Sequence, residues 1–296
     1  LVTTWLPPVP QLLPLLAVAL SVGTRGLVAI LGHATFSGWR ARIFFLGVLG
    51  SAIPLRLVEG TGHYDTLFIL GSVLIAFPQR WLWVVGSLIA TTSHSEASVI
   101  SGVSVLLVGF AFRQQAIRQR GLLLTLIGTA STIAITTAGQ LADRSSDTRA
   151  TLLVDYLGAS IANNVAWLPQ TLASGYLAAW LVVIVMIMSV DSGRQVVLLT
   201  SGLVLLPALT MVFTLDGTRV FVVSSTAAFL LTFIAWLSSG STAQSPRAIK
   251  ERAPGYLAGV LFILMIVVPE TSVFTLSPDI RIAPWKVLVD VYFALR

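Results

Sequence analysis

Long apolar runs recur along almost the whole chain, and they restrict the fold more than any other feature of the sequence. The longer runs cover roughly 17 to 25 residues, the length that an α-helix needs to cross the hydrocarbon core of a bilayer. In lipid, only helices and closed barrels satisfy their backbone hydrogen bonds, and these runs lack the period-two alternation of barrel strands. The sequence therefore predicts an all-α, polytopic membrane protein.

Composition supports this class and excludes several others. Only 10% of the residues are charged and 56% are hydrophobic, whereas about a quarter of a soluble domain is charged. With no cysteine, the chain can form neither disulfides nor thiolate metal sites. It carries no nucleic-acid motif, no phosphate-binding glycine loop and no HExxH zinc helix. Its net charge of +6 is assigned to inner loops and anionic lipids.

The apolar runs predict about ten membrane segments within one integral membrane domain, residues 1–296. They are residues 11–31, 41–58, 66–78, 81–92, 97–112, 121–139, 175–190, 195–215, 219–238 and 255–268. The third and fourth contain only about a dozen residues each and are joined through Pro78. They are either short tilted helices or a re-entrant pair, a feature that often marks a site in membrane proteins.

Basic residues predict the orientation. Arginines and a lysine concentrate in the loops near residues 40–42, 113–120 and 247–252, and short basic loops stay in the cytoplasm. Ten of the twelve acidic residues then fall on or near the outer side: Glu59, Asp65, Glu96, Asp143, Asp147, Asp155, Asp216, Glu270, Asp279 and Asp290. We expect a bacterial cytoplasmic membrane protein with an acidic outer face, although outer loops also tolerate acids without any function.

Two further stretches predict interfacial helices on the outer face. Residues 141–174 form the longest outer connection and contain Tyr156 and Trp167. Residues 285–296 show a similar sequence pattern. Moderately apolar helices with aromatic residues at headgroup depth lie in the membrane surface. They either position a lipid-linked substrate or serve only in packing.

The loop VEGTGHYDT holds Glu59, His63 and Asp65 within seven residues. Two carboxylates and an imidazole at this spacing can bind a divalent cation or provide a general base. The alternative is a solvated loop without a function.

His94 and Glu96 lie at a junction between two apolar segments, in ATTSHSEASVIS. No loop is long enough to lift them far from the membrane, so they are candidates for catalysis. The structural alternative is helix capping, with serines such as Ser95 as caps and Glu96 stabilised by the helix dipole.

Asp216 and Arg219 occupy a short link between two long apolar segments, in TLDGTRVF. They can form a salt bridge that closes a helical hairpin. Alternatively, Arg219 binds a phosphate through its planar guanidinium while Asp216 orients it. Their expected place at a membrane surface suits a lipid phosphate.

Together, the many membrane segments, the acidic early loop VEGTGHYDT, the interfacial helices and Arg219 resemble integral-membrane glycosyltransferases that use polyprenyl-phosphate sugars (GT-C-like). They also resemble bacterial polysaccharide polymerases. The resemblance is one of architecture and implies a transferase or polymerase of envelope glycans or lipid-linked sugars. It implies that Asp65, Glu59 or Glu96 deprotonates an acceptor hydroxyl and that Arg219 holds the departing lipid phosphate.

Two other classes fit the same residues. A transporter or lipid flippase would use His94 or Glu96 at mid-membrane depth for proton or cation coupling. A non-catalytic subunit would dock a membrane-protein partner and keep its charged residues dispersed. An enzyme, by contrast, would gather its acidic residues and Arg219 around one outward-opening cavity.

Overall fold

The computed structural model describes residues 12–54, 57, 65–141, 149–214, 217–239, 260, 263–264, 270–274 and 277–281. Within these residues, five helices are long and apolar enough to cross a membrane. They cover Val18–Thr35, Gln115–Ala138, Leu168–Met188, Gly193–Val212 and Gly217–Ser239. Asp65–Ala76 and Ser95–Ala111 are shorter apolar helices. The chain is thus a mainly helical integral membrane protein.

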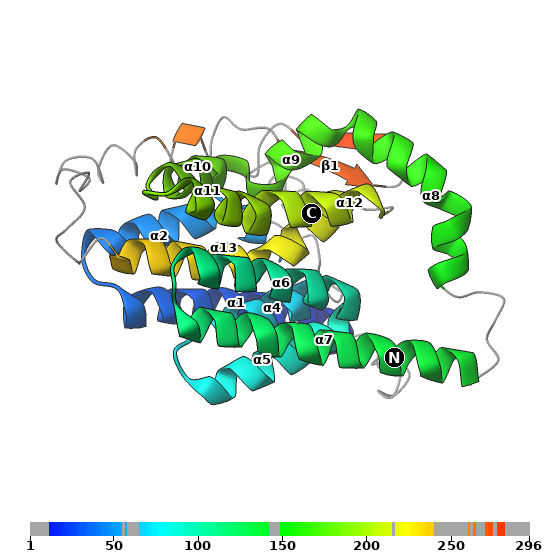
Figure 1. Cartoon of the computed structure of the whole chain (residues 1–296), viewed down its shortest axis with the longest axis horizontal. Helices are drawn as coiled ribbons and strands as arrows, with labels where there is room; N and C mark the ends of the chain where they lie inside the picture. Colours follow the sequence, from blue (N-terminus) through cyan, green and yellow to red (C-terminus); the bar gives the residue numbers. More distant parts are fainter. Residues whose placement is uncertain are drawn as a thin grey trace.

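Figure 1 shows how the helices are arranged. Their bounds are α1 Leu12–Thr35, α2 Trp39–Leu49, α4 Asp65–Ala76, α5 Arg80–Ser93, α6 Ser95–Ala111, α7 Gln115–Leu141, α8 Arg149–Ala166, α9 Leu168–Tyr176, α10 Trp180–Met188, α11 Gly193–Thr200, α12 Leu206–Val212 and α13 Gly217–Ser239. A 3₁₀ turn, Leu177–Ala179, links α9 to α10, and a π-helical segment, Ser201–Leu205, links α11 to α12. An antiparallel hairpin pairs β1, Glu270–Phe274, with β2, Ser277–Arg281.

Glycines allow close contact within two helical hairpins. A Cβ atom at Gly71 of α4 would lie 2.5 Å from the carbonyl oxygen of Gly86 in α5. A Cβ atom at Gly121 of α7 would lie 2.8 Å from the carbonyl oxygen of Gly102 in α6. Small residues at helix interfaces let backbones approach in this way, so α4–α5 and α6–α7 are tightly paired units.

Most of the described arginines lie at one end of the bundle, which we call the basic end. The turns after α1, α4, α6 and α10 all lie there, on the left of Figure 1. Arg40, Arg80, Arg113 and Arg194 lie in or beside these turns. Arg120, also near this end, donates to the Ala76 carbonyl oxygen at 3.3 Å and so joins α7 to the end of α4.

Helix α13 forms the centre of the bundle. Almost all of its residues from Gly217 to Leu237 are buried, and it contacts α4, α6, α9 and α12. A helix that is apolar all round is expected to be surrounded by other helices. Phe221 and Phe229 from α13 pack against the ring of Tyr176, with centroids 5.4 Å away in both cases.

Two of the long apolar helices are discontinuous. The first breaks at Leu177, which has a positive φ of 49°. The second contains the π-helical segment and Pro207. In an α-helix the Leu203 carbonyl would accept from residue 207, but proline has no N–H; the Tyr176 hydroxyl donates to this oxygen instead, at 2.8 Å.

Three features differ from the sequence-based expectation. Within the predicted segment 41–58, helix α2 ends at Leu49. Gly50 is its C-cap, and the Ser51 hydroxyl donates to the Val48 carbonyl oxygen. The membrane-spanning helix expected from residue 175 begins at Leu168, so the predicted outer connection is shorter. The hairpin β1–β2 was not anticipated in an all-α chain. Most of segment 255–268 and all of residues 285–296 lie outside the described residues.

The short pair 66–78 and 81–92 corresponds to α4 and α5, which form an antiparallel helical hairpin of 12 and 14 residues. At 1.5 Å per residue they measure about 18 and 21 Å, less than the roughly 30 Å hydrocarbon core. Both alternatives, tilted helices and a re-entrant pair, remain compatible with these lengths.

Candidate functional site

Asp65 is the first residue of α4, and its side chain is buried between helices. Only 1% of the residue is exposed. A carboxylate at a helix N-terminus is stabilised by the helix dipole, but a buried charge also needs partners that replace water. Two such partners come from distant parts of the chain.

The first partner is His94, the single residue between α5 and α6. Its non-helical backbone separates the two helices, and its carbonyl oxygen accepts from the Ser98 hydroxyl. The His94 Nε2 atom lies 2.7 Å from Asp65 Oδ1. When the carboxylate accepts this bond, Nε2 carries the proton, and in neutral imidazole Nδ1 is then the basic nitrogen.

The second partner is Arg219, the third residue of α13. Its Nε atom lies 3.1 Å from Asp65 Oδ2, and 27% of its side chain remains exposed. A cation in the first turn of a helix opposes the helix dipole, so the carboxylate of Asp65 offsets an otherwise unfavourable position. The ion pair joins the start of α13 to the start of α4.

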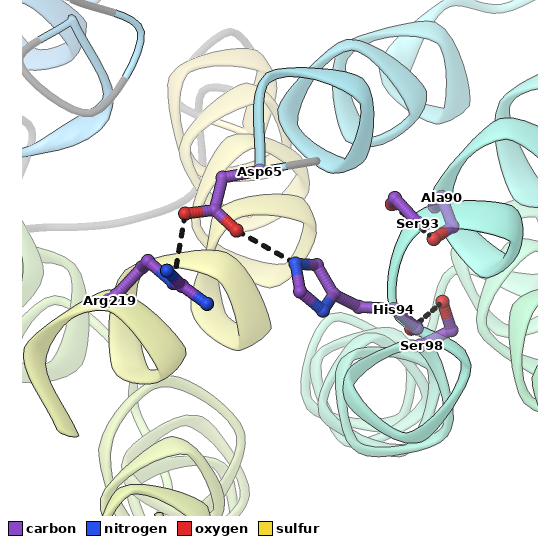
Figure 2. Close-up of polar contacts among 6 residues, drawn as sticks. All are labelled: Asp65, Ala90, Ser93, His94, Ser98 and Arg219. Atoms are coloured by element: carbon purple, nitrogen blue, oxygen red, sulfur yellow. Dashed lines mark hydrogen bonds and ion pairs between the residues drawn. The ribbon is translucent and has the colours of Figure 1, made fainter. Parts of the chain in front are cut away.

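We call Asp65, His94 and Arg219 the Asp65 cluster (Figure 2). Each carboxylate oxygen of Asp65 faces one partner, and the second nitrogen of the His94 ring lies on the side away from Asp65. No described residue hydrogen-bonds that nitrogen. The arrangement combines an oriented imidazole with a partly exposed guanidinium, which can take up a proton and hold an anion.

Glu96 is not part of the Asp65 cluster. It lies in the first turn of α6, where the helix dipole favours an acid, and its side chain is exposed. The expected serine cap is absent, because the N-cap of α6 is His94 and makes no side-chain capping bond. The Ser93 hydroxyl instead donates to the Ala90 carbonyl oxygen in the preceding helix.

Three other candidates lie outside the described residues: Glu59, His63 and Asp216. The divalent-cation site expected from Glu59, His63 and Asp65 therefore stays a prediction. Among the residues that the structure describes, no group of three His, Asp or Glu side chains is placed to hold a metal ion.

All three members of the Asp65 cluster are candidates in the sequence, but their pairing is not evident there. In the sequence, Asp65 lies close to Glu59, His94 to Glu96 and Arg219 to Asp216. The contact from Asp65 to His94 spans 29 residues, and no sequence pattern identifies which helix ends meet.

Comparisons with known proteins add no identification. No protein-family model, curated protein or solved structure matches this chain.

Proposed function

We propose that the protein is a membrane transferase or polymerase that moves a sugar from a lipid phosphate to an acceptor hydroxyl. The observation that carries the proposal is the Asp65 carboxylate shared between His94 and Arg219. A base held by a carboxylate beside a guanidinium supplies the two functions that this reaction needs. The five candidate membrane spans support a lipid-borne substrate.

The reaction balances without a redox partner. The acceptor hydroxyl oxygen forms a bond to the anomeric carbon while the bond from that carbon to the phosphate oxygen breaks. The hydroxyl proton goes to Nδ1 of His94, and the bonding electron pair leaves with the phosphate. Arg219 offsets the negative charge that develops on the phosphate oxygens.

This assignment changes the role expected for Asp65. The sequence makes its carboxylate a candidate base, but the residue is 1% exposed and both of its oxygens face partners. We therefore assign the proton transfer to His94 and a positioning role to Asp65. A buried carboxylate that accepts a hydrogen bond from an imidazole fixes the tautomer and the orientation of the ring.

We further propose that the basic end lies in the cytoplasm and the Asp65 cluster opens toward the outer side. Short basic loops favour this orientation. The proposal includes about ten membrane segments in a bacterial cytoplasmic membrane, with α4 and α5 as the short pair. Because these two helices are short, the junctions at Asp65 and His94 would be recessed below the outer boundary.

A proton-coupled transporter is the second candidate. The buried Asp65–His94 pair and the two discontinuous helices, broken at Leu177 and at Ser201–Leu205, favour it. Intramembrane acid–histidine pairs act as proton relays, and broken helices often form transport sites. A transporter would move its substrate without changing any covalent bond.

The test uses the purified protein in proteoliposomes with a panel of radiolabelled polyprenyl-phosphate hexoses and oligosaccharide acceptors. We expect label to pass from the lipid fraction to the acceptor, and His94→Gln or Arg219→Gln to lower the rate by about a hundredfold or more. The matched variants His33→Gln and Arg42→Gln, whose side chains are exposed, should transfer at the wild-type rate.

Substrate-dependent proton uptake without transfer would replace the transferase with the transporter. If the wild-type protein did neither, the non-catalytic subunit would be favoured.

A further inference from the structure

Arg25 lies inside a candidate membrane span, Val18–Thr35, far from either end of α1. It precedes Thr35, the last residue of α1, by ten residues, which is about 15 Å along a helix. If the basic end marks one edge of the hydrocarbon core, Arg25 lies near the centre of a core about 30 Å thick. Snorkelling of an arginine from that depth does not reach the headgroups.

A charged side chain at this depth is unfavourable unless a polar partner meets it. One guanidinium nitrogen of Arg25 donates to the Pro54 carbonyl oxygen at 3.2 Å. No other hydrogen bond or ion pair joins Arg25 to the described residues. Because guanidinium has five N–H donors, most of them lack a partner among the described residues.

The surface around Arg25 is open. The side chain of Arg25 is exposed, and a Cβ atom at Gly23 or Gly26 would meet nothing within 4 Å. Val22 and Ile30 on the same helix are also exposed, at 59% and 57%. The surroundings are thus apolar side chains with one charged group between them, which suits a ligand that has both an anionic head and a hydrocarbon chain.

The depth of Arg25 also matches that of Asp65. Asp65 precedes Ala76, the last residue of α4, by eleven residues, or about 16 Å along a helix. Helices α1 and α4 are in contact, and both end at the basic end. Measured from the basic end, Arg25 therefore lies at about the same level of the bundle as Asp65.

We propose that Arg25 binds the phosphate of a lipid-anchored ligand that enters from the bilayer, with the isoprenoid or alkyl chain along the open face of α1. This inference rests on the proposed function for the nature of the ligand. The guanidinium matches phosphate oxygens in a bidentate manner, and Pro54 fixes its orientation through the one backbone contact. A free, fully hydrated phosphate would have to leave water to reach this depth.

The experiment measures binding, not transfer, of farnesyl phosphate to the full-length protein in neutral detergent by native mass spectrometry. We expect Arg25→Met to weaken binding of farnesyl phosphate by about tenfold to a hundredfold, because the variant loses one or two charge-assisted hydrogen bonds. The matched variant Arg42→Met, at the basic end, should bind as the wild type does. Farnesol should bind weakly to all three proteins, and inorganic phosphate should not compete.

Thermal unfolding separates ligand binding from a structural role. If Arg25 is retained for a ligand, Arg25→Met should unfold at or above the wild-type temperature, since it removes a charge from an apolar surface. Unchanged farnesyl phosphate binding, or lower stability with unchanged binding, would overturn the inference. Effective competition by inorganic phosphate would show a site for free phosphate and would overturn the lipid assignment.

The proposed function and the Arg25 site can be contradicted independently of each other. Arg25-dependent binding without sugar transfer would contradict the proposed function alone. Sugar transfer that is insensitive to Arg25→Met would contradict only this inference.

Discussion

The Tyr176 hydroxyl donates to the Leu203 carbonyl oxygen, 2.8 Å away, and so joins the two discontinuous helices of the bundle. The acceptor is available because Pro207, four residues later, has no N–H. Tyr176 is 2% exposed and Leu203 is fully buried, so water does not replace the bond.

We therefore predict that Tyr176→Phe lowers the free energy of unfolding by about 1–3 kcal/mol, the penalty of a buried unpaired carbonyl. Pro207→Ala restores an N–H to the helix and should recover much of this loss in the double variant. The measurement is a double-mutant cycle of unfolding in mixed micelles. Additive effects of the two substitutions would contradict the explanation.

His94 can be tested apart from its structural role. A glutamine at this position would place an amide nitrogen near the position of Nε2, so His94→Gln should keep the bond to Asp65 and unfold close to the wild-type temperature. The variant has no basic nitrogen there, so the transfer rate should still fall by about a hundredfold or more. Wild-type transfer by this variant would mean that the imidazole only holds the helices together.

Asp65→Asn removes the charge that Arg219 and His94 share. Arg219 keeps 27% exposure, so water offsets part of the loss, and we expect a destabilisation of about 1–3 kcal/mol. The matched variant Asp191→Asn changes an exposed acid and should stay within about 0.5 kcal/mol of the wild type. Equal stability of the two variants in chemical unfolding would argue against a stabilising Asp65 cluster.

Gly71→Ala should separate α4 from α5. Its Cβ atom would lie 2.5 Å from the carbonyl oxygen of Gly86. A backbone atom cannot move away as the end of a flexible side chain can, so we expect this overpacking to lower the stability by about 1–3 kcal/mol. Gly158→Ala is the control, because a Cβ atom there meets nothing within 4 Å. Thermal unfolding of the two variants should differ clearly, and similar melting temperatures would contradict the tight α4–α5 contact.

The orientation can be tested with single cysteines, because the natural chain has none. Gln79→Cys, in the turn between α4 and α5, should react with a membrane-impermeant maleimide only after the cells are opened. Ser146→Cys, in the predicted outer connection, should react in intact cells. The reverse pattern would invert the topology, and labelling of both from outside would invalidate the helix arrangement across the membrane.

Sequence reasoning anticipated the ends of the best-defined helices closely. The predicted segments 81–92, 97–112 and 219–238 correspond to α5, α6 and α13 within a few residues, because unbroken apolar runs have sharp polar ends. It failed at residues 41–58, where apolar residues continue past a turn at Gly50 and Ser51. It also missed the hairpin β1–β2, whose five-residue strands are too short for a clear pattern.

The sequence by itself determined the membrane class, the approximate positions of most apolar helices and the positions where charges interrupt apolar segments, since these depend on local hydropathy. Only the tertiary structure decided which interruptions meet. Asp65, His94 and Arg219 converge because α4, the α5–α6 junction and α13 pack side by side, while Glu96, only two residues from His94, remains exposed. Packing between distant helices sets these contacts, and a local sequence pattern carries no information about distant partners.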